Sequence, residues 1–340
     1  MKEISSIIAA VAAFAVTALS GVYIIPFLKK LKFGQTILEE GPSWHEKKQG
    51  TPTMGGLMII AGVFISVVIA LSISAFGNSD TVTEIKNPVL LSRFIAGIIM
   101  ALCMGLIGFL DDYIKVVKKR NLGLTAKQKS FFQLLIAAGY LLSLYLGGMT
   151  STWLPILGNI SVVSGAGILF WPVSLVFVYF FTNAVNLTDG IDGLCGSVTL
   201  VVGCAFMLAS DFAGFALNSL LSAALAGACV GFILWNAHPA KVFMGDTGSL
   251  FLGGMVIAVS YGIGRPVLLI LAGIIYLVEA LSVVLQVAWF KKTGKRIFKM
   301  SPIHHHFEMC KWSEEKIVFV FSFVTLIGCA IAILPIIIFS

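Results

Sequence analysis

Residues 89–115 read VLLSRFIAGIIMALCMGLIGFLDDYIK, a nearly continuous apolar run that ends in two adjacent carboxylates and a lysine. A helix of about 20 apolar residues crosses the hydrocarbon core of a bilayer, so the run 89–110 is long enough to span a membrane. Asp111 and Asp112 would then lie where the helix leaves the membrane. The stretch therefore predicts a transmembrane helix whose end carries polar chemistry.

Similar apolar runs recur along the whole chain. With the first, they cover residues 4–28, 53–76, 89–110, 130–149, 165–185, 194–211, 216–235, 248–262, 266–290 and 316–339. The chain has 340 residues, 58% hydrophobic and 11% charged, whereas a soluble protein carries about 25% charged residues. Its mean hydropathy is +0.99. We predict an all-α integral membrane protein with about ten transmembrane helices, forming a single polytopic domain over residues 1–340.

Basic residues are distributed unevenly between the two ends of these expected spans. Of the 23 lysines and arginines, all but Lys2, Lys86, Arg93 and Arg265 fall in loops on one side if every run crosses. Short loops rich in Lys and Arg stay in the cytoplasm. This side is therefore expected to be cytoplasmic and both termini extracytoplasmic. The net charge of +7 is then a topology signal, and no nucleic-acid partner is expected.

The pair Asp111 and Asp112 has two interpretations. If the helix continues, they pair with Lys115 at i, i+4 and i, i+3 and simply close the helix at the membrane surface. Alternatively, adjacent carboxylates beside a basic run are typical of a Mg²⁺–phosphate site, because Mg²⁺ prefers oxygen ligands and shares its shell with substrate phosphates. The pattern alone leaves both open.

Other polar motifs fall in loops on the same side. The loop 41–56 surrounds Lys47 and Lys48 with Gly and Thr. It is either an ordinary basic loop of the cytoplasmic side or an anion-binding loop, although it lacks the P-loop spacing. Asn183 and Asn186 share a helical face, and the two aspartates that follow repeat their spacing; such groups bind nucleobase edges or make Asx turns. Further on, Asp246 either caps a helix or belongs to a site.

Residues 299–308 form a polar, histidine-rich segment near the end of the chain. Consecutive histidines point about 100° apart, which does not suit one helix face, so a loop or short irregular piece is expected after Pro302. The segment is either a solvated loop or part of a site. Glu279, inside the run 266–290, is an ionisable residue at bilayer depth and should face the protein interior or a wet cavity.

Five stretches, in this order, resemble the polyprenyl-phosphate N-acetylhexosamine-1-phosphate transferases, and within them the phospho-N-acetylmuramoyl-pentapeptide transferases. They are Lys47–Gly56, Phe109–Tyr113, Asn186–Gly193, Phe243–Ser249 and Pro302–Glu308. The first and last favour the muramoyl-pentapeptide members over the relatives that use UDP-N-acetylglucosamine. The resemblance covers nearly the whole chain.

The resemblance implies a multi-pass enzyme of the bacterial plasma membrane that takes part in peptidoglycan synthesis. It would transfer phospho-N-acetylmuramoyl-pentapeptide from the UDP-linked donor (UDP-MurNAc-pentapeptide) to undecaprenyl phosphate, giving lipid I and UMP. The active site would lie in the cytoplasmic loops and use Mg²⁺, with the lipid tail in an apolar groove beside a bent ninth helix. A homodimer is the family's habit and is the expectation here.

The resemblance also assigns residues to roles. The implied catalytic core is Asp111, Asp112, Asp246, His304 and His305, with the metal held chiefly by Asp246 together with Asp111. The implied substrate-binding residues are Lys48, Thr53, Asn183, Asn186, Asp189, Asp192, Asn236, Phe243, Gln286 and His306, with Lys115, Lys119 and Lys127 along the phosphate path.

Acid–base chemistry limits the roles of the aspartates. A phosphate monoester has a second pKa of about 6 and is mostly a dianion near pH 7.5, so the acceptor does not demand a strong base. A carboxylate of ordinary pKa, about 3.9, is a weak base. Asp111 and Asp112 are therefore expected to order the metal and orient the lipid phosphate, while a role as base and a two-step route through Asp246 stay open. The rival class is an anion transporter, but these bind near the midplane, often between inverted repeats, and no internal repeat is found.

Overall fold

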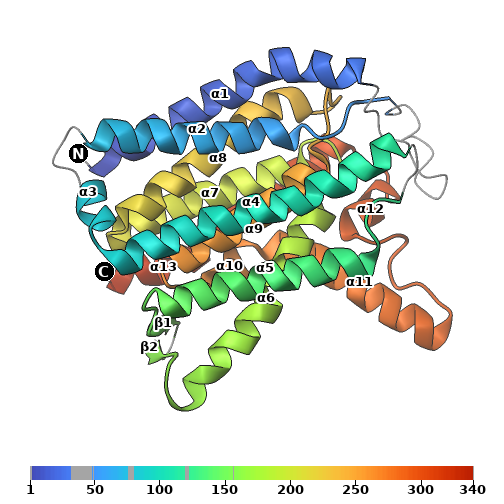
Figure 1. Cartoon of the computed structure of the whole chain (residues 1–340). Helices are drawn as coiled ribbons and strands as arrows, with labels where there is room; N and C mark the ends of the chain where they lie inside the picture. The colour runs from blue at the N-terminus through green and yellow to red at the C-terminus, as the bar shows by residue number, and fades with distance from the viewer. Residues whose placement is uncertain are drawn as a thin grey trace.

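The chain forms a helical bundle in the computed structural model, which describes residues 2–31, 48, 50–75, 80–118, 122–155 and 157–339 (Figure 1). The helices of the first half are α1 (Lys2–Lys30), α2 (Gly56–Ala75), α3 (Asp80–Ile85), α4 (Pro88–Val117), α5 (Ala126–Leu146) and α6 (Phe170–Thr188). Those of the second half are α7 (Leu194–Ala213), α8 (Ala216–Asn236), α9 (Gly245–Gly262), α10 (Leu268–Ala272), α11 (Ile274–Thr293), α12 (Ile303–Glu308) and α13 (Glu314–Phe339).

Within these described ranges, nine helices are long and apolar enough to cross a membrane, which confirms a helical integral membrane protein. The expected span 248–262 forms α9, which is not among the nine. Every residue of α9 from Thr247 to Gly262 is buried. A helix surrounded by protein does not need the hydropathy of one that faces lipid, so its glycines and serines serve packing.

Small residues bring α9 close to α4. A Cβ at Gly254 would lie 2.6 Å from the Cα of Ala101, and one at Gly97 would lie 2.8 Å from the Cβ of Ala258. Larger side chains would separate the two helices, because neither backbone has room to spare. This contact fixes α9 against the length of α4 and holds their polar ends together.

The expected ninth span is broken into α10 and α11 at Gly273, as the resemblance implied. A Cβ at Gly273 would lie 2.8 Å from the carbonyl oxygen of Leu269, so the bend needs a residue without a side chain. Beyond the bend, α11 diverges from the bundle, at the lower right of Figure 1.

Two features differ from the expectations based on the sequence. A short antiparallel hairpin, β1 (Ser151–Leu154) and β2 (Gly158–Ser161), pairs Ser151 with Ser161 and precedes the 3₁₀ helix η2 (Gly165–Leu169). The three histidines are also not in a loop: they lie on α12, which begins directly after Pro302. Both chain ends lie at the same end of the bundle as the hairpin, and α12 lies at the other (Figure 1).

Candidate active site

The carboxylate of Asp112 reaches from α4 to the start of α9. Its Oδ1 accepts a hydrogen bond from the backbone N–H of Asp246 at 3.2 Å, and its Oδ2 accepts from the N–H and the hydroxyl of Thr247 at 2.9 and 2.7 Å. The first N–H groups of a helix lack partners within it and attract negative charge. Asp112 therefore caps α9 from a neighbouring helix.

Two glycines make this cap possible. A Cβ at Gly108 would overlap the carbonyl group of Asp246, so α4 can approach the start of α9 only without a side chain there. Gly245 has a φ of 69°, in the left-handed region, and a Cβ there would lie 2.5 Å from the Asp112 carboxylate and 2.7 Å from the Thr53 hydroxyl. The Gly-Asp-Thr-Gly sequence thus folds tightly around the acid of another helix.

Asp111, one residue earlier on α4, is also buried and faces a different set of partners. Lys115 is its i, i+4 ion pair, with Nζ 2.6 Å from Oδ2, as the helical interpretation predicted. Its Oδ1 accepts from the backbone N–H of Leu124 at 2.8 Å. The predicted i, i+3 pairing of Asp112 with Lys115 is wrong, because the oxygens of Asp112 bond to α9. These adjacent acids on one helix therefore bind different partners.

Asp246 lies in the first turn of α9 but does not cap it. Its Oδ2 is 2.9 Å from Nζ of Lys115 and 3.2 Å from Nζ of Lys129, and its Oδ1 accepts from Nδ2 of Asn186 at 2.8 Å. The helix has no side-chain cap of its own, so the capping interpretation of Asp246 is wrong. Its carboxylate faces α4, α5 and α6 instead.

The three aspartates form one cluster that could hold a metal ion. One carboxylate oxygen from each of Asp111, Asp112 and Asp246 lies within 4.8 Å of the others. Oxygen ligands in such a group suit a hard divalent cation. The ammonium groups of Lys115 and Lys129 lie against the same carboxylates and balance part of their charge. The cluster combines metal ligands with cations that can bind phosphate.

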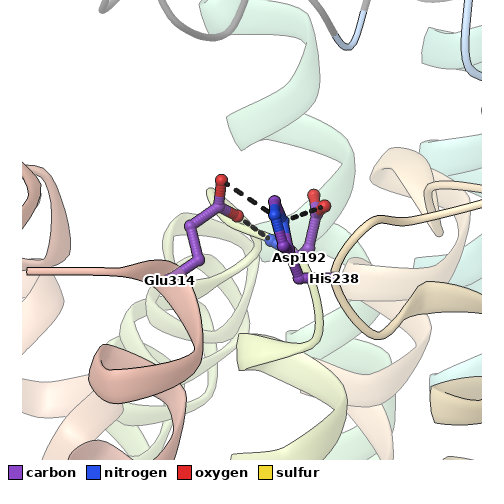
Figure 2. A group of neighbouring side chains, drawn as sticks. All are labelled: Asp192, His238 and Glu314. Carbon is purple, nitrogen blue, oxygen red and sulfur yellow. Dashed lines mark hydrogen bonds and ion pairs between the residues drawn. The ribbon is translucent and has the colours of Figure 1, made fainter.

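A second charged cluster joins Lys48, Asp192, His238 and Glu314. Figure 2 shows the two acids and the histidine, which come from separate segments and point toward one another. The Lys48 Nζ is 2.7 Å from Oδ1 of Asp192 and 2.7 Å from Oε2 of Glu314. His238 Nδ1 is 3.1 Å from Oδ2 of Asp192, which also accepts from the N–H of Ala240 at 3.0 Å. Two of the expected donor-site residues, Lys48 and Asp192, thus bind each other.

Two of the three histidines of α12 have carboxylate partners. His304 is fully buried, with Nδ1 3.1 Å from Oε2 of Glu279, which is itself fully buried. His305 Nδ1 lies 2.6 Å from Oε2 of Glu308. The Nε2 of His304 has no hydrogen-bond partner among the described residues and lies where a Cβ of Gly190 would be. Glu279, which was expected to face the protein interior or a wet cavity, is therefore paired inside the protein with a predicted catalytic histidine.

Asp189 and Gly190 belong to the turn between α6 and α7. Burial raises the pKa of Asp189 well above its usual range, and the negative charges of Asp246 and Asp112 raise it further. The turn therefore connects the aspartate cluster on one side with His304 on the other. Asn236 supports it from α8: Oδ1 accepts from the Gly193 N–H at 3.0 Å, and Nδ2 donates to the Val242 carbonyl at 2.9 Å.

Several predicted binding residues support the backbone instead of facing the clusters. Gln286 donates to the Phe298 carbonyl and accepts from the N–H groups of Ile297 and Phe298. Asn183 donates to Oε1 of Gln133, in the contact between α5 and α6. His306 accepts from the N–H of Lys299 through Nδ1. These three side chains hold segments that carry the site.

The remaining predicted residues are placed less centrally. Phe243 is partly buried, and its backbone pairs with the first loop through the carbonyl of Pro52 and the N–H of Gly55, at 2.8 and 2.9 Å. Lys127 is exposed on α5. Lys119 lies outside the described residues. The substrate-binding roles of Phe243 and Lys127 stay predictions.

Two contributors are missing from the sequence-based set. Lys129 contacts Asp246, although the resemblance had assigned Lys127, two residues earlier, to the phosphate path. Glu314 joins the second cluster from the first turn of α13, where it reads as an ordinary charge before an apolar run. Both contributions depend on how the helices are placed in the fold: α5 directs Lys129 toward Asp246, and the start of α13 lies beside Asp192.

The chain matches the profile of glycosyl transferase family 4 over residues 94–264 and a phospho-N-acetylmuramoyl-pentapeptide-transferase signature over residues 48–60. The fold and the clustered acids thus define a membrane-embedded glycosyl transferase of that class.

Similar proteins narrow this class to one family. The chain is 42% identical to the phospho-N-acetylmuramoyl-pentapeptide-transferase of Caldicellulosiruptor bescii over 98% of both chains. It is 43% identical to that of Shouchella clausii over 96% of both, and 47% identical to that of Clostridium perfringens strain 13 over 96% of this chain and 97% of the relative. The chain belongs to the phospho-N-acetylmuramoyl-pentapeptide transferase family. It is a phosphoglycosyl transferase of peptidoglycan synthesis.

Proposed function

We propose that the protein transfers phospho-N-acetylmuramoyl-pentapeptide from UDP-MurNAc-pentapeptide to undecaprenyl phosphate, with Mg²⁺, giving lipid I and UMP. The observation that carries the proposal is the convergence of Asp111, Asp112 and Asp246 with Lys115 and Lys129 at one end of the bundle. Metal-ligating oxygens beside two ammonium groups suit two phosphate-bearing substrates that must be held together.

The bond changes balance without an external base. An oxygen of the lipid phosphate dianion attacks the sugar-linked phosphorus of the donor, and the bond from that phosphorus to the bridging oxygen breaks. UMP leaves with that oxygen, so one phosphoanhydride replaces another. Because most of the acceptor is already ionised, positioning and charge neutralisation supply most of the rate.

Each charged residue of the first cluster has a role in this scheme. Asp246 and Asp111 would hold Mg²⁺, which supplies charge neutralisation at the diphosphate. Asp112 fixes the start of α9 and with it the position of Asp246. Lys115 and Lys129 bind phosphate oxygens once substrates share the cluster, and Asn186 orients Asp246. We also assign catalytic roles to His304 and His305. A substrate can reach the buried ring of His304 only if the neighbouring turn moves.

We place the donor on the side of the second cluster. Lys48, Asp192, Asp189 and Phe243 lie on segments that bond to one another around the start of α9. The nucleoside diphosphate would lie along them, with Thr53 and Asn236 supporting the surrounding loops. The polyprenyl chain would follow the apolar surface of α11.

The site would face the cytoplasm of a bacterial plasma membrane, with both termini outside. The uneven distribution of basic residues supports this orientation, as do chain ends that lie away from α12 (Figure 1). A homodimer, which the resemblance to the family suggests, is part of the proposal.

The test is release of UMP in detergent. Purified protein with UDP-MurNAc-pentapeptide, undecaprenyl phosphate and Mg²⁺ should release UMP and form a lipid-linked product, and EDTA should stop both. Omitting the acceptor should leave only background. Efficient turnover of UDP-N-acetylglucosamine instead would assign the protein to the related transferases. A protein inactive in detergent, but active in moving anions across sealed vesicles, would be a transporter.

A further inference from the structure

Glu314 is a buried carboxylate for which neither the sequence motifs nor the transfer reaction has supplied a role. It lies in the first turn of α13 and is 9% exposed. Its neighbour Glu315, in the same turn, is exposed. A carboxylate is buried at a cost unless it has partners, so the difference between the two acids points to a specific task for Glu314.

The partners of Glu314 are two predicted donor-site residues. Its Oε2 accepts from the Lys48 ammonium at 2.7 Å and from the backbone N–H of Asp192 at 3.0 Å. Its Oε1 is 3.7 Å from Nδ1 of His238. One carboxylate at the start of α13 therefore contacts Asp192 in the turn between α6 and α7 and His238 in the loop after α8 (Figure 2). The same carboxylate also binds Lys48.

The two hydrogen bonds that Lys48 donates fix the orientation of its ammonium group. An ammonium group has three N–H donors, and Asp192 and Glu314 take two of them at equal distances. A lysine held by one carboxylate alone can swing, whereas two acceptors define where the remaining donor points. The bond from the Asp192 N–H fixes the turn to the same carboxylate.

Asp192, His238 and Glu314 also have the spacing of a metal site, with ligand atoms within 4.8 Å of one another. Lys48 already supplies a cation between the two acids. The Lys48 ammonium supplies the positive charge that a metal ion would supply there. The geometry therefore favours a role in positioning Lys48 over a second metal site.

We propose that Glu314 is a positioning residue for the donor: it holds Lys48 and the Asp192 turn in the geometry that binds the nucleoside diphosphate. This inference rests on the proposed function, because it takes the donor to be a UDP-sugar. It predicts a selective effect. Donor affinity depends on Glu314, whereas the polyprenyl phosphate, which uses the aspartate cluster and the surface of α11, does not.

The experiment compares Glu314→Gln, Glu314→Ala and the matched control Glu315→Gln, which removes the same charge from the same helical turn. Binding of UDP-MurNAc-pentapeptide is measured by calorimetry in detergent, and both KM values and kcat by UMP release. Glu314→Ala should raise the donor Kd and KM by about 10-fold or more, with kcat and acceptor KM within about 3-fold. Glu314→Gln keeps an acceptor for the Asp192 N–H and should lose less. Glu315→Gln should behave as wild type.

Coupling to Lys48 separates positioning from folding. In Lys48→Ala, the further change Glu314→Ala should cost much less donor affinity than it does in the wild type, because the shared contact is already gone. The inference would be overturned if Glu314→Ala cost the same donor affinity in both backgrounds, or if it left donor affinity unchanged. It would also be overturned if kcat and thermal stability fell together while both KM values rose. If the wild type binds donor but releases no UMP, the proposed function fails while the binding comparison still decides the role of Glu314. A wild type that does not bind the donor overturns both.

Discussion

Asp246 shows how much a single residue depends on its surroundings. Its carboxylate is held by donors from three helices: Lys115 on α4, Lys129 on α5 and Asn186 on α6. Each donor favours the ionised carboxylate, so Asp246 stays charged even though it lies in a crowded site. A charged oxygen ligand that is already oriented needs no rearrangement to receive a cation.

Replacing Asp246 with Asn removes one negative oxygen and keeps the size of the side chain. We expect turnover in the UMP-release assay to fall by on the order of 10³–10⁴. Asp211→Asn, at the exposed end of α7, should leave the rate unchanged. Wild-type activity of Asp246→Asn with Mg²⁺ would show that Asp246 is not the principal ligand.

Lys129 and Lys127 offer a comparison within one helix. Lys129 contacts Asp246, while Lys127 is exposed. Lys129→Met should lower kcat/KM by about 10-fold or more, because a phosphate-binding cation and a partner of Asp246 are lost together. Lys127→Met should change kcat/KM by less than about 2-fold. The reverse order would favour Lys127, which the resemblance assigned to the phosphate path.

At the scale of elements, the short helices and turns bring the chemistry together. The start of α9 is capped by Asp112 of α4, and α12 places His304 against Glu279 of α11 and against the turn between α6 and α7. These contacts are between elements far apart in the sequence. The site is therefore a junction of helix ends, and its geometry depends on how each helix is held.

Gly190 tests the contact between that turn and α12. A Cβ there would overlap the His304 imidazole, which is fully buried and tied to Glu279, so the ring or the turn must shift. Gly190→Ala should reduce kcat by at least about 10-fold with the protein still folded. Circular dichroism and the detergent melting temperature check the fold.

The control is Gly139→Ala on α5, where a new Cβ meets nothing within 4 Å. Alanine is a better helix former than glycine, so stability should stay equal or rise by up to about 1 kcal/mol. If Gly190→Ala retains full activity, the tight contact with His304 is not needed for turnover.

At the scale of the whole molecule, the distribution of basic residues along the sequence and the packing of the helices both indicate that one end of the bundle is polar. The helix α12, which carries His304, lies at the end of the bundle away from the chain termini (Figure 1). Positive loops that remain in the cytoplasm would keep a soluble, nucleotide-linked donor and the site on the same side.

Reporter fusions measure this orientation. Alkaline phosphatase, active only outside the cytoplasm, should be active when fused after Ser340 and inactive when fused within the loop 294–299. Green fluorescent protein at the same two positions should give the opposite result. Fusions that report both positions on one side would contradict the proposed topology.

The motifs and runs in the sequence determined the class, the spans and the central acids. Long apolar stretches must be helical in a membrane, since each backbone N–H and C=O needs a partner inside its own segment. This requirement is local, so the runs from 4–28 to 316–339 all became helices. The family resemblance of their motifs predicted Asp111, Asp112 and Asp246 as part of the catalytic core, whereas the residue pattern alone left their roles open.

Only the tertiary structure decided which polar groups meet. The distant contacts include Asp112 as the cap of α9, Lys129 as a partner of Asp246, Glu279 as the partner of His304, and Glu314 as the acceptor for Lys48. A run of apolar residues states that a helix forms, but not its rotation or its neighbours. Those follow from close contacts such as Gly108 with Asp246 and Gly254 with Ala101, where packing of small residues sets the register between helices.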